Sequence, residues 1–199
     1  MTDNPTTLKP FDLSGENPWR TNGTALVYEN KYLRLREDAV LGPDGRPGTY
    51  TYIEFPAPII GIVPVANDGQ VYLVRQWRYP WARNSWEIPV GSSRPGEDIL
   101  VAAQRELAEE AGVIAASWKP LGSVYASSIF DQSYQLYLAQ GLSASANAPR
   151  SGTEQDLEPC RIPLSTAVQA ALDGVIVHGV TIVALLRAAA SLKLTNFVI

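Results

Sequence analysis

Cysteine and histidine are almost absent from this sequence, which has one of each among its 199 residues. The single cysteine, Cys160, excludes an intrachain disulfide and leaves no cysteine cluster for zinc, which suits a reducing cytoplasm. His178 is likewise the single histidine, so catalytic mechanisms that need several histidines or a cysteine cluster are not available to this sequence. We therefore expect a cytoplasmic protein in which His178, placed in a turn before the last helix, takes no part in the chemistry.

Basic residues are also outnumbered, because 16 Lys and Arg face 20 Asp and Glu and leave a net charge of −4. Proteins that bind nucleic acids broadly usually present a basic surface to the phosphate backbone. No nucleic-acid partner is therefore expected. A small substrate that carries phosphate would need local cations or a bound metal ion.

Long apolar runs are missing as well. The most apolar stretch, residues 180–194, is interrupted by Arg187 and Lys193 and is shorter than the roughly 20 residues that a membrane span needs. The first ten residues have neither the charged nor the apolar part of a secretory signal. The sequence thus predicts a buried helix at 180–193 and no membrane partner.

The residues that are present favour one globular domain with an N-terminal appendage, since 46% of them are hydrophobic. Residues 1–56 are predicted to form a loose leader and a small antiparallel sheet, and residues 57–199 the main domain. Asn67, Asp68 and Gly69 predict a hairpin that opens the main sheet. Helical periodicity over 98–111 ends at Gly112. Further strands are expected at 121–125 and 133–138, a loop at roughly 141–158, and helices at 164–173 and 180–193.

An acidic cluster occupies the second half of the helix predicted at 98–111. Glu106 and Glu110 are one turn apart on one face, and Glu109 adjoins them. Like charges at this spacing each cost roughly 0.2–0.5 kcal/mol, and the negative end of the helix dipole adds to the repulsion. A divalent cation would resolve the conflict, because hard ions prefer carboxylate oxygens. The spacing alone favours an ordinary solvated acidic face over a metal site.

The stretch around the cluster resembles the signature of the Nudix superfamily at every fixed position. The nine matching residues are Gly91, Glu97, Arg105, Glu106, Leu107, Glu109, Glu110, Gly112 and Val113. The resemblance implies an α/β Nudix fold, an α/β/α sandwich with a mixed sheet, preceded here by the small N-terminal antiparallel sheet. It also makes residues 57–199 the Nudix catalytic domain.

The same resemblance implies a metal site for Mg²⁺, with Mn²⁺ as a substitute. Glu106 and Glu110 would be the principal ligands, Glu97 and Glu109 nearby ligands or their supporting partners, and the backbone carbonyl of Val90 a further ligand. Glu109 and Glu110 would also count as catalytic residues. Arg105 is expected to be a structural ion-pair partner rather than a substrate ligand.

Motifs outside the signature resemble the ADP-ribose pyrophosphatase branch, among them residues 74–80, 86–89 and 180–186. This implies hydrolysis of the diphosphate bond of a nucleoside diphosphate derivative such as ADP-ribose or a related nucleotide sugar. The products would be a nucleoside monophosphate and a sugar phosphate. Two alternatives stay open, a dinucleoside or CoA-type substrate and a Nudix-fold sensor that binds a nucleotide without turnover.

Substrate and proton would be handled by residues outside the signature. Arg75 and Arg78 could clamp phosphates, or form surface ion pairs instead. In this branch a carboxylate from a later loop often acts as the general base, and Glu154 is the first choice, with Asp156 and Glu158 as alternatives. These three could also be plain solvated acids.

A homodimer is expected, because the N-terminal sheet is too small to be stable alone. Aromatic residues are numerous, with nine Tyr and five Trp. Trp77, Tyr79 and Trp81 could stack on a base, although the density of aromatic residues favours packing in the core or at the dimer interface.

Overall fold

The computed structural model describes residues 13–146 and 156–194. Within these ranges the strands form three sheets, and three α-helices accompany them. Glu154 lies outside the described residues. The strands are β1 (Arg20–Glu29), β2 (Arg34–Leu41), β3 (Pro47–Glu54), β4 (Ile59–Pro64), β5 (Gln70–Arg78), β6 (Arg83–Glu87), β7 (Val90–Ser92), β8 (Val113–Val124), β9 (Tyr134–Ala144) and β10 (Glu158–Pro163). The helices are α1 (Ile99–Ala111), α2 (Leu164–Leu172), α3 (Gly179–Ser191) and the short 3-10 turn η1 (Tyr79–Trp81).

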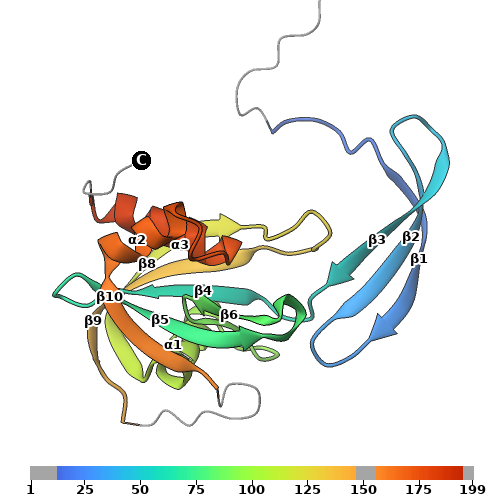
Figure 1. Ribbon diagram of the computed structural model, residues 1–199. Coiled ribbons are helices and arrows are strands. Elements are labelled where there is room, and N and C mark those ends of the chain that lie inside the picture. Colours follow the sequence, from blue (N-terminus) through green and yellow to red (C-terminus); the bar gives the residue numbers. More distant parts are fainter. Residues whose placement is uncertain (1–12, 147–155, 195–199) are drawn as a thin grey trace, which may run out of the picture.

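The N-terminal sheet stands apart from the main body (Figure 1) and pairs β1, β2 and β3 in antiparallel order, as predicted. Ion pairs link β2 to β3, since Arg34 and Arg36 both bind the Glu54 carboxylate, at 2.6 and 2.8 Å. The chain leaving β3 is held by the segment before β9. There Gln132 Nε2 donates to the carbonyls of Phe55 and Ala57 at 2.6 and 3.0 Å.

The main body is a layered α/β structure in which β4 has a helix layer on each face. The mixed sheet has the order β7-β4-β9-β8, with β4 and β9 parallel. Ile60 and Ile62 pack against α1 together with Ala103 and Leu107. Val63, on the opposite face of the pleat, packs against α2 and α3. Figure 1 shows the same layering, and the predicted α/β/α sandwich is confirmed.

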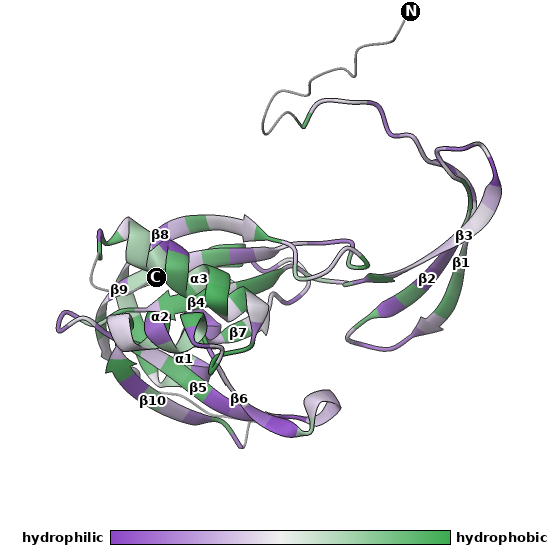
Figure 2. Cartoon of the chain, turned by 45° about the horizontal axis from the view of Figure 1, so that its top comes forward, coloured by the Kyte–Doolittle hydropathy of each residue, from purple (hydrophilic) through white to green (hydrophobic). Residues whose placement is uncertain are grey.

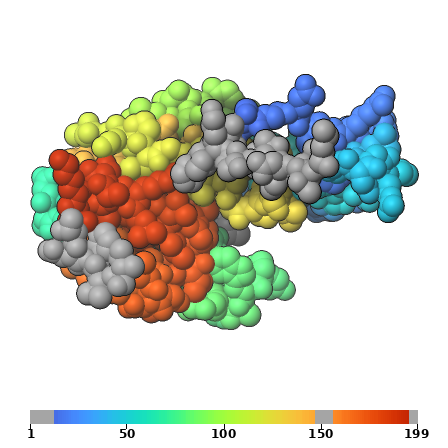
Figure 3. Space-filling view, turned by 90° about the horizontal axis from the view of Figure 1, so that it is seen from above, coloured from blue at the N-terminus to red at the C-terminus, as the bar shows by residue number. Residues whose placement is uncertain are grey.

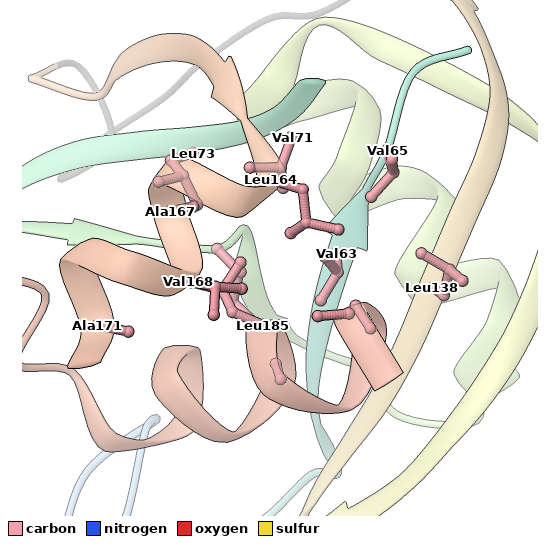
Figure 4. Packing of buried hydrophobic residues seen from close by; sticks show 14 of the residues in the cluster. Val63, Val65, Val71, Leu73, Leu138, Leu164, Ala167, Val168, Ala171 and Leu185 are labelled. Atoms are coloured by element: carbon pink, nitrogen blue, oxygen red, sulfur yellow. The ribbon is translucent and has the colours of Figure 1, made fainter. Parts of the chain in front are cut away.

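The α2 and α3 layer is held by aliphatic packing. Leu164, Val168 and Leu185 are directed from the helices towards Val63 (Figure 4), and none of the four is more than 1% exposed. Both helices begin and end within two residues of their expected bounds. No helix among the described residues is long and apolar enough to cross a membrane.

The predicted β4–β5 hairpin is wrong in one respect. Asn67, Asp68 and Gly69 do form a tight turn, and Gly69 has a φ of 77°. However, only the isolated pair Val65 and Val71 bridges the two strands. Beyond it they separate, because β5 pairs with β10 and β6 in a second, antiparallel sheet while β4 joins the mixed one. Turn chemistry fixes the reversal of the chain but not the partner of each strand.

The strand predicted at 121–125 is the end of a much longer one. β8 begins at Val113, directly after the C-cap of α1, and pairs with β9 along its length. Most of its side chains are at least partly exposed. Its first half therefore lacks the clear apolar alternation that marks a strand in sequence.

Candidate active site

The acidic cluster is placed by a short strand, a turn and a well-capped helix. β7 pairs with β4, Gly91 lying opposite Ile60. The Asp98 carboxylate caps α1 by accepting from the amides of Leu100 and Val101 at 2.9 and 3.2 Å. Gly112 ends the helix with a φ of 68°, the left-handed conformation that favours glycine. The helix start and stop read from the sequence are confirmed.

Gly91 allows the Glu106 carboxylate to lie directly on the backbone of β7. A Cβ atom at this position would be 2.0 Å from Cδ of Glu106 and 2.3 and 2.4 Å from its two oxygens. Any side chain larger than hydrogen would therefore displace that carboxylate. The glycine of the signature is here a packing requirement rather than a turn requirement.

We expect Gly91→Ala to lower kcat by about tenfold to a hundredfold, because the added Cβ displaces the carboxylate of Glu106, a predicted metal ligand. The overpacking should also reduce the free energy of unfolding by about 1–3 kcal/mol. Steady-state kinetics and urea unfolding measure the two effects. Gly48→Ala is the matched control, since a Cβ there meets nothing within 4 Å. A Gly91→Ala enzyme with normal kcat would contradict the proposed role of Glu106.

Glu106 and Glu110 are buried carboxylates, only 5% and 6% exposed. Oε2 of Glu110 accepts a hydrogen bond from the backbone N–H of Val90 at 3.0 Å. Both carboxylates therefore lie on one face of α1 and contact the backbone of Val90 and Gly91 in β7. Glu109 is more open, with its side chain 24% exposed.

Arg105 joins three of the four acids of the site into one network. Its guanidinium binds Glu97 through Nε at 3.0 Å, and Nη1 binds Glu106 and Glu109 at 2.8 and 3.1 Å. Nη2 also donates to the Ser92 carbonyl at 2.9 Å. The hydrogen bonds from Arg105 lower the pKa of Glu97 to about 2. The ion pairs expected of Arg105 are present.

A groove runs beside this backbone. Its cavity of about 410 Å³ is lined by Arg78, Val90, Gly91, Ser92 and His178, together with Ile59, Pro80, Trp81 and Tyr134. Arg78 donates to both oxygens of the buried Glu87 carboxylate, at 2.7 and 2.5 Å. This pairing raises the pKa of Arg78, so the guanidinium stays charged. A fixed cation therefore faces the groove next to the acidic cluster.

Arg75, the second predicted arginine, lies earlier on β5, where Asp156 and Glu158 contact the strand. Arg75 binds Glu158 at 2.6 Å and does not line the groove described above. Oδ2 of Asp156 accepts from the Trp77 amide at 3.3 Å. Of the two arginines, the structure thus brings only Arg78 to the groove. His178, expected to be a bystander, does line it; no sequence pattern signals this, because the burial of its ring depends on the fold.

Comparison with protein families gives the assignment. The model described as NUDIX domain matches residues 56–177. The chain belongs to the Nudix family. A second model, described as nucleoside diphosphate sugar hydrolase N-terminal domain, matches residues 19–53, the region of the separate sheet.

Similar proteins agree with the Nudix assignment. An ADP-ribose pyrophosphatase of Mycobacterium tuberculosis is 30% identical over 174 residues, covering 86% of this chain and 83% of its own. A methanol dehydrogenase activator of Bacillus methanolicus is 29% identical over 151 residues, covering 75% of this chain and 81% of its own. A crystal structure of an ADP compounds hydrolase has a TM-score of 0.79 at 21% identity, over 93% of this chain and 100% of that one. The last confirms the Nudix fold.

Nudix hydrolases use divalent metal ions, and the residues of this site fit such an ion. Four carboxylates gather within two turns of α1 and the preceding loop, and oxygen donors are what hard divalent ions take. The gap that Gly91 leaves is filled by a carboxylate. These carboxylates are neighbours but do not converge on one point, since among residues 13–146 and 156–194 no three acidic, His or Cys side chains are close enough together to hold a metal ion. The guanidinium of Arg105 places its positive charge between Glu97, Glu106 and Glu109.

Proposed function

We propose that this Nudix hydrolase cleaves the diphosphate bond of ADP-ribose or a related nucleotide sugar with Mg²⁺, giving a nucleoside monophosphate and a sugar phosphate. The main structural support is the pair Glu106 and Glu110, buried against Val90 and Gly91 at the edge of a groove that Arg78 lines. The names of the similar proteins support the choice of substrate. An acid cluster and a fixed cation side by side suit a metal-bound diphosphate.

Glu106 and Glu110 would hold the metal ion, with Glu97, Glu109 and the Val90 carbonyl as further candidates. Such an ion neutralises phosphate charge and activates water. Arg78, whose direction is fixed by Glu87, would bind a phosphate oxygen and orient the diphosphate. Arg105 would keep the neighbouring carboxylates in place. Glu109 stays a candidate catalytic residue, since it is the most exposed of the three helix carboxylates.

The proton acceptor is proposed to be Glu154. Both alternatives have partners in the structure, Asp156 on the Trp77 amide and Glu158 on Arg75. The ion pair with Glu158 gives Arg75 a structural partner. That Arg75 also contacts the substrate stays a prediction.

The proposal is tested with a panel of nucleotide sugars, dinucleotides, CoA and nucleoside triphosphates, incubated with Mg²⁺, with Mn²⁺ or with excess EDTA. Chromatography should show AMP and ribose 5-phosphate from ADP-ribose with a divalent ion and no products with EDTA. Faster turnover of CoA or a dinucleotide would favour the alternative substrate class. Tight binding without turnover would favour a sensor, and full turnover in EDTA would contradict the metal mechanism.

We also propose the division into an N-terminal sheet unit, residues 1–56, and a catalytic domain, residues 57–199, in a cytoplasmic homodimer. Every residue of β1 is exposed, including the large apolar residues Leu26, Val27 and Tyr28, which are 49%, 56% and 55% exposed. Figure 2 shows the hydrophobic part of β1, which is an edge strand of the separate sheet. A second copy would bury such a strand.

Light scattering of the full chain at micromolar concentration should therefore give twice the mass of the 21.6 kDa chain. Val27→Lys should shift the equilibrium towards the monomer, because it places a charge in the proposed interface. Glu37→Lys, in an exposed position of β2, is the control for added charge. A wild-type mass of one chain would contradict the dimer.

A further inference from the structure

Two cavities meet at the side chains of Trp81, Tyr134 and His178. The first is the groove beside Val90 and Gly91. The second, about 480 Å³, continues between the segment after β8 and the start of α3, and its lining includes Phe130 and Val183. Figure 3 shows the segment that connects β5 to β6, in green, projecting from the body on the same side as the N-terminal sheet. A ligand that extends from the groove into the second cavity has to pass His178.

The His178 ring is fixed by contacts along one edge. Its Nδ1 lies 2.8 Å from Oγ1 of Thr181, and this hydroxyl oxygen also accepts from the Ile88 amide at 3.1 Å. The same Nδ1 is 3.4 Å from Oε2 of Glu87, the carboxylate that holds Arg78. Whichever tautomer is present, the Nδ1 edge is occupied. Nε2, at the other side of the ring, has no hydrogen-bond partner among the described residues, so it is the nitrogen left for a ligand.

Capping does not explain this histidine. His178 precedes α3 as its N-cap residue, but its side chain makes no capping hydrogen bond. Small polar residues are strongly preferred at such positions because they do bind the first amides of the helix. The imidazole is instead 15% exposed at the junction of the two cavities.

The surroundings favour a neutral ring. Burial lowers the pKa of His178, and the Arg78 charge acts in the same direction although Glu87 opposes it. A neutral imidazole nitrogen pairs well with a hydroxyl group, as donor or acceptor. The charged phosphate has a better partner next to it in Arg78.

We propose that His178 is a specificity-determining residue whose Nε2 hydrogen-bonds a hydroxyl of a sugar attached to the diphosphate. The inference rests on the proposed function and deepens it, since the sugar is either the ribose of the nucleoside or the terminal sugar. Phosphate binding is assigned to Arg78 and to the metal ion that the acidic cluster would hold. His178 would bind the part of the substrate that extends towards the second cavity.

Two variants separate the ring nitrogens. The side-chain amide of Asn reaches about as far as Nδ1 and can keep the Thr181 contact, whereas that of Gln extends towards the Nε2 position. Calorimetry with Mg²⁺ then measures the Kd of AMP, ribose 5-phosphate and inorganic phosphate for wild type, His178→Asn and His178→Gln. Unfolding curves check that both variants are folded.

We expect His178→Asn to raise the Kd of one of the two sugar phosphates about tenfold, the effect of one hydrogen bond. The Kd of inorganic phosphate should not change, and His178→Gln should restore part of the affinity. The affected compound identifies the sugar. Equal affinities in all three proteins, or an equal loss for inorganic phosphate, would overturn the role of His178 while leaving the proposed function intact. A wild-type protein that binds neither AMP nor ribose 5-phosphate would also overturn the role of His178, whereas the proposed function fails only if the substrate panel gives no products.

Discussion

Replacing Glu110 with glutamine is expected to lower kcat by about a thousandfold or more. Metal ligation supplies several kcal/mol of transition-state stabilisation, and each 1.36 kcal/mol is a factor of ten in rate. Glutamine keeps the shape of the side chain and an oxygen that can accept from the Val90 amide. It removes one negative charge from a crowded helix face, so the free energy of unfolding should change by less than about 1 kcal/mol.

Steady-state kinetics, calorimetric titration of Mg²⁺ and urea unfolding separate these effects. Metal affinity should fall together with kcat, while the unfolding midpoint stays close to that of wild type. Asp173→Asn, at the exposed end of α2, makes the same change in charge far along the chain from the cluster and is the control. A Glu110→Gln enzyme with near-normal kcat would mean that the metal ion is held elsewhere.

Glu154→Gln is expected to lower kcat by about 10²–10⁴-fold, the usual contribution of a general base. Carboxylates that bind the metal cannot readily also accept the proton of the attacking water, so the base is expected to be a separate group. Because that group does not hold the metal ion, metal affinity and KM should remain nearly unchanged. Initial rates over a range of substrate concentrations and calorimetric titration of Mg²⁺ measure these quantities.

Asp156→Asn and Glu158→Gln are the matched comparisons, since they change neighbouring acids that already have partners on β5. A loss confined to one of these two would transfer the role of base to that residue. If none of the three variants loses activity, the base lies among the helix carboxylates or the reaction needs none.

The main layers and the acidic cluster could be predicted from sequence because their signals are local. Asp98, Gly112 and the apolar stripe of α1 define a helix within 15 residues, and three carboxylates on it need no tertiary information to share a face. The separation of β4 from β5 could not be predicted in this way. It depends on β10, more than 80 residues later, which takes the place beside β5.

Only part of the groove could be predicted from the sequence, because its residues come from distant parts of the chain. Arg78 follows an apolar strand and precedes the signature, which marks it as a candidate. Its partner Glu87 gives no sign of being a buried carboxylate, and His178 comes from a turn some 90 residues later in the chain. Sequence patterns identify residues that act from one element. Residues from three elements that meet at one cavity become visible only when the packing is known.

The Arg105 network makes its members inseparable in energetic terms. One guanidinium serves Glu97, Glu106 and Glu109, so removing any one acid changes what the other two receive from it. Single substitutions in such a set do not add, and each measures the rearrangement of the whole set as well as its own bond. The contribution of each carboxylate is therefore defined only by a double-mutant cycle that includes Arg105.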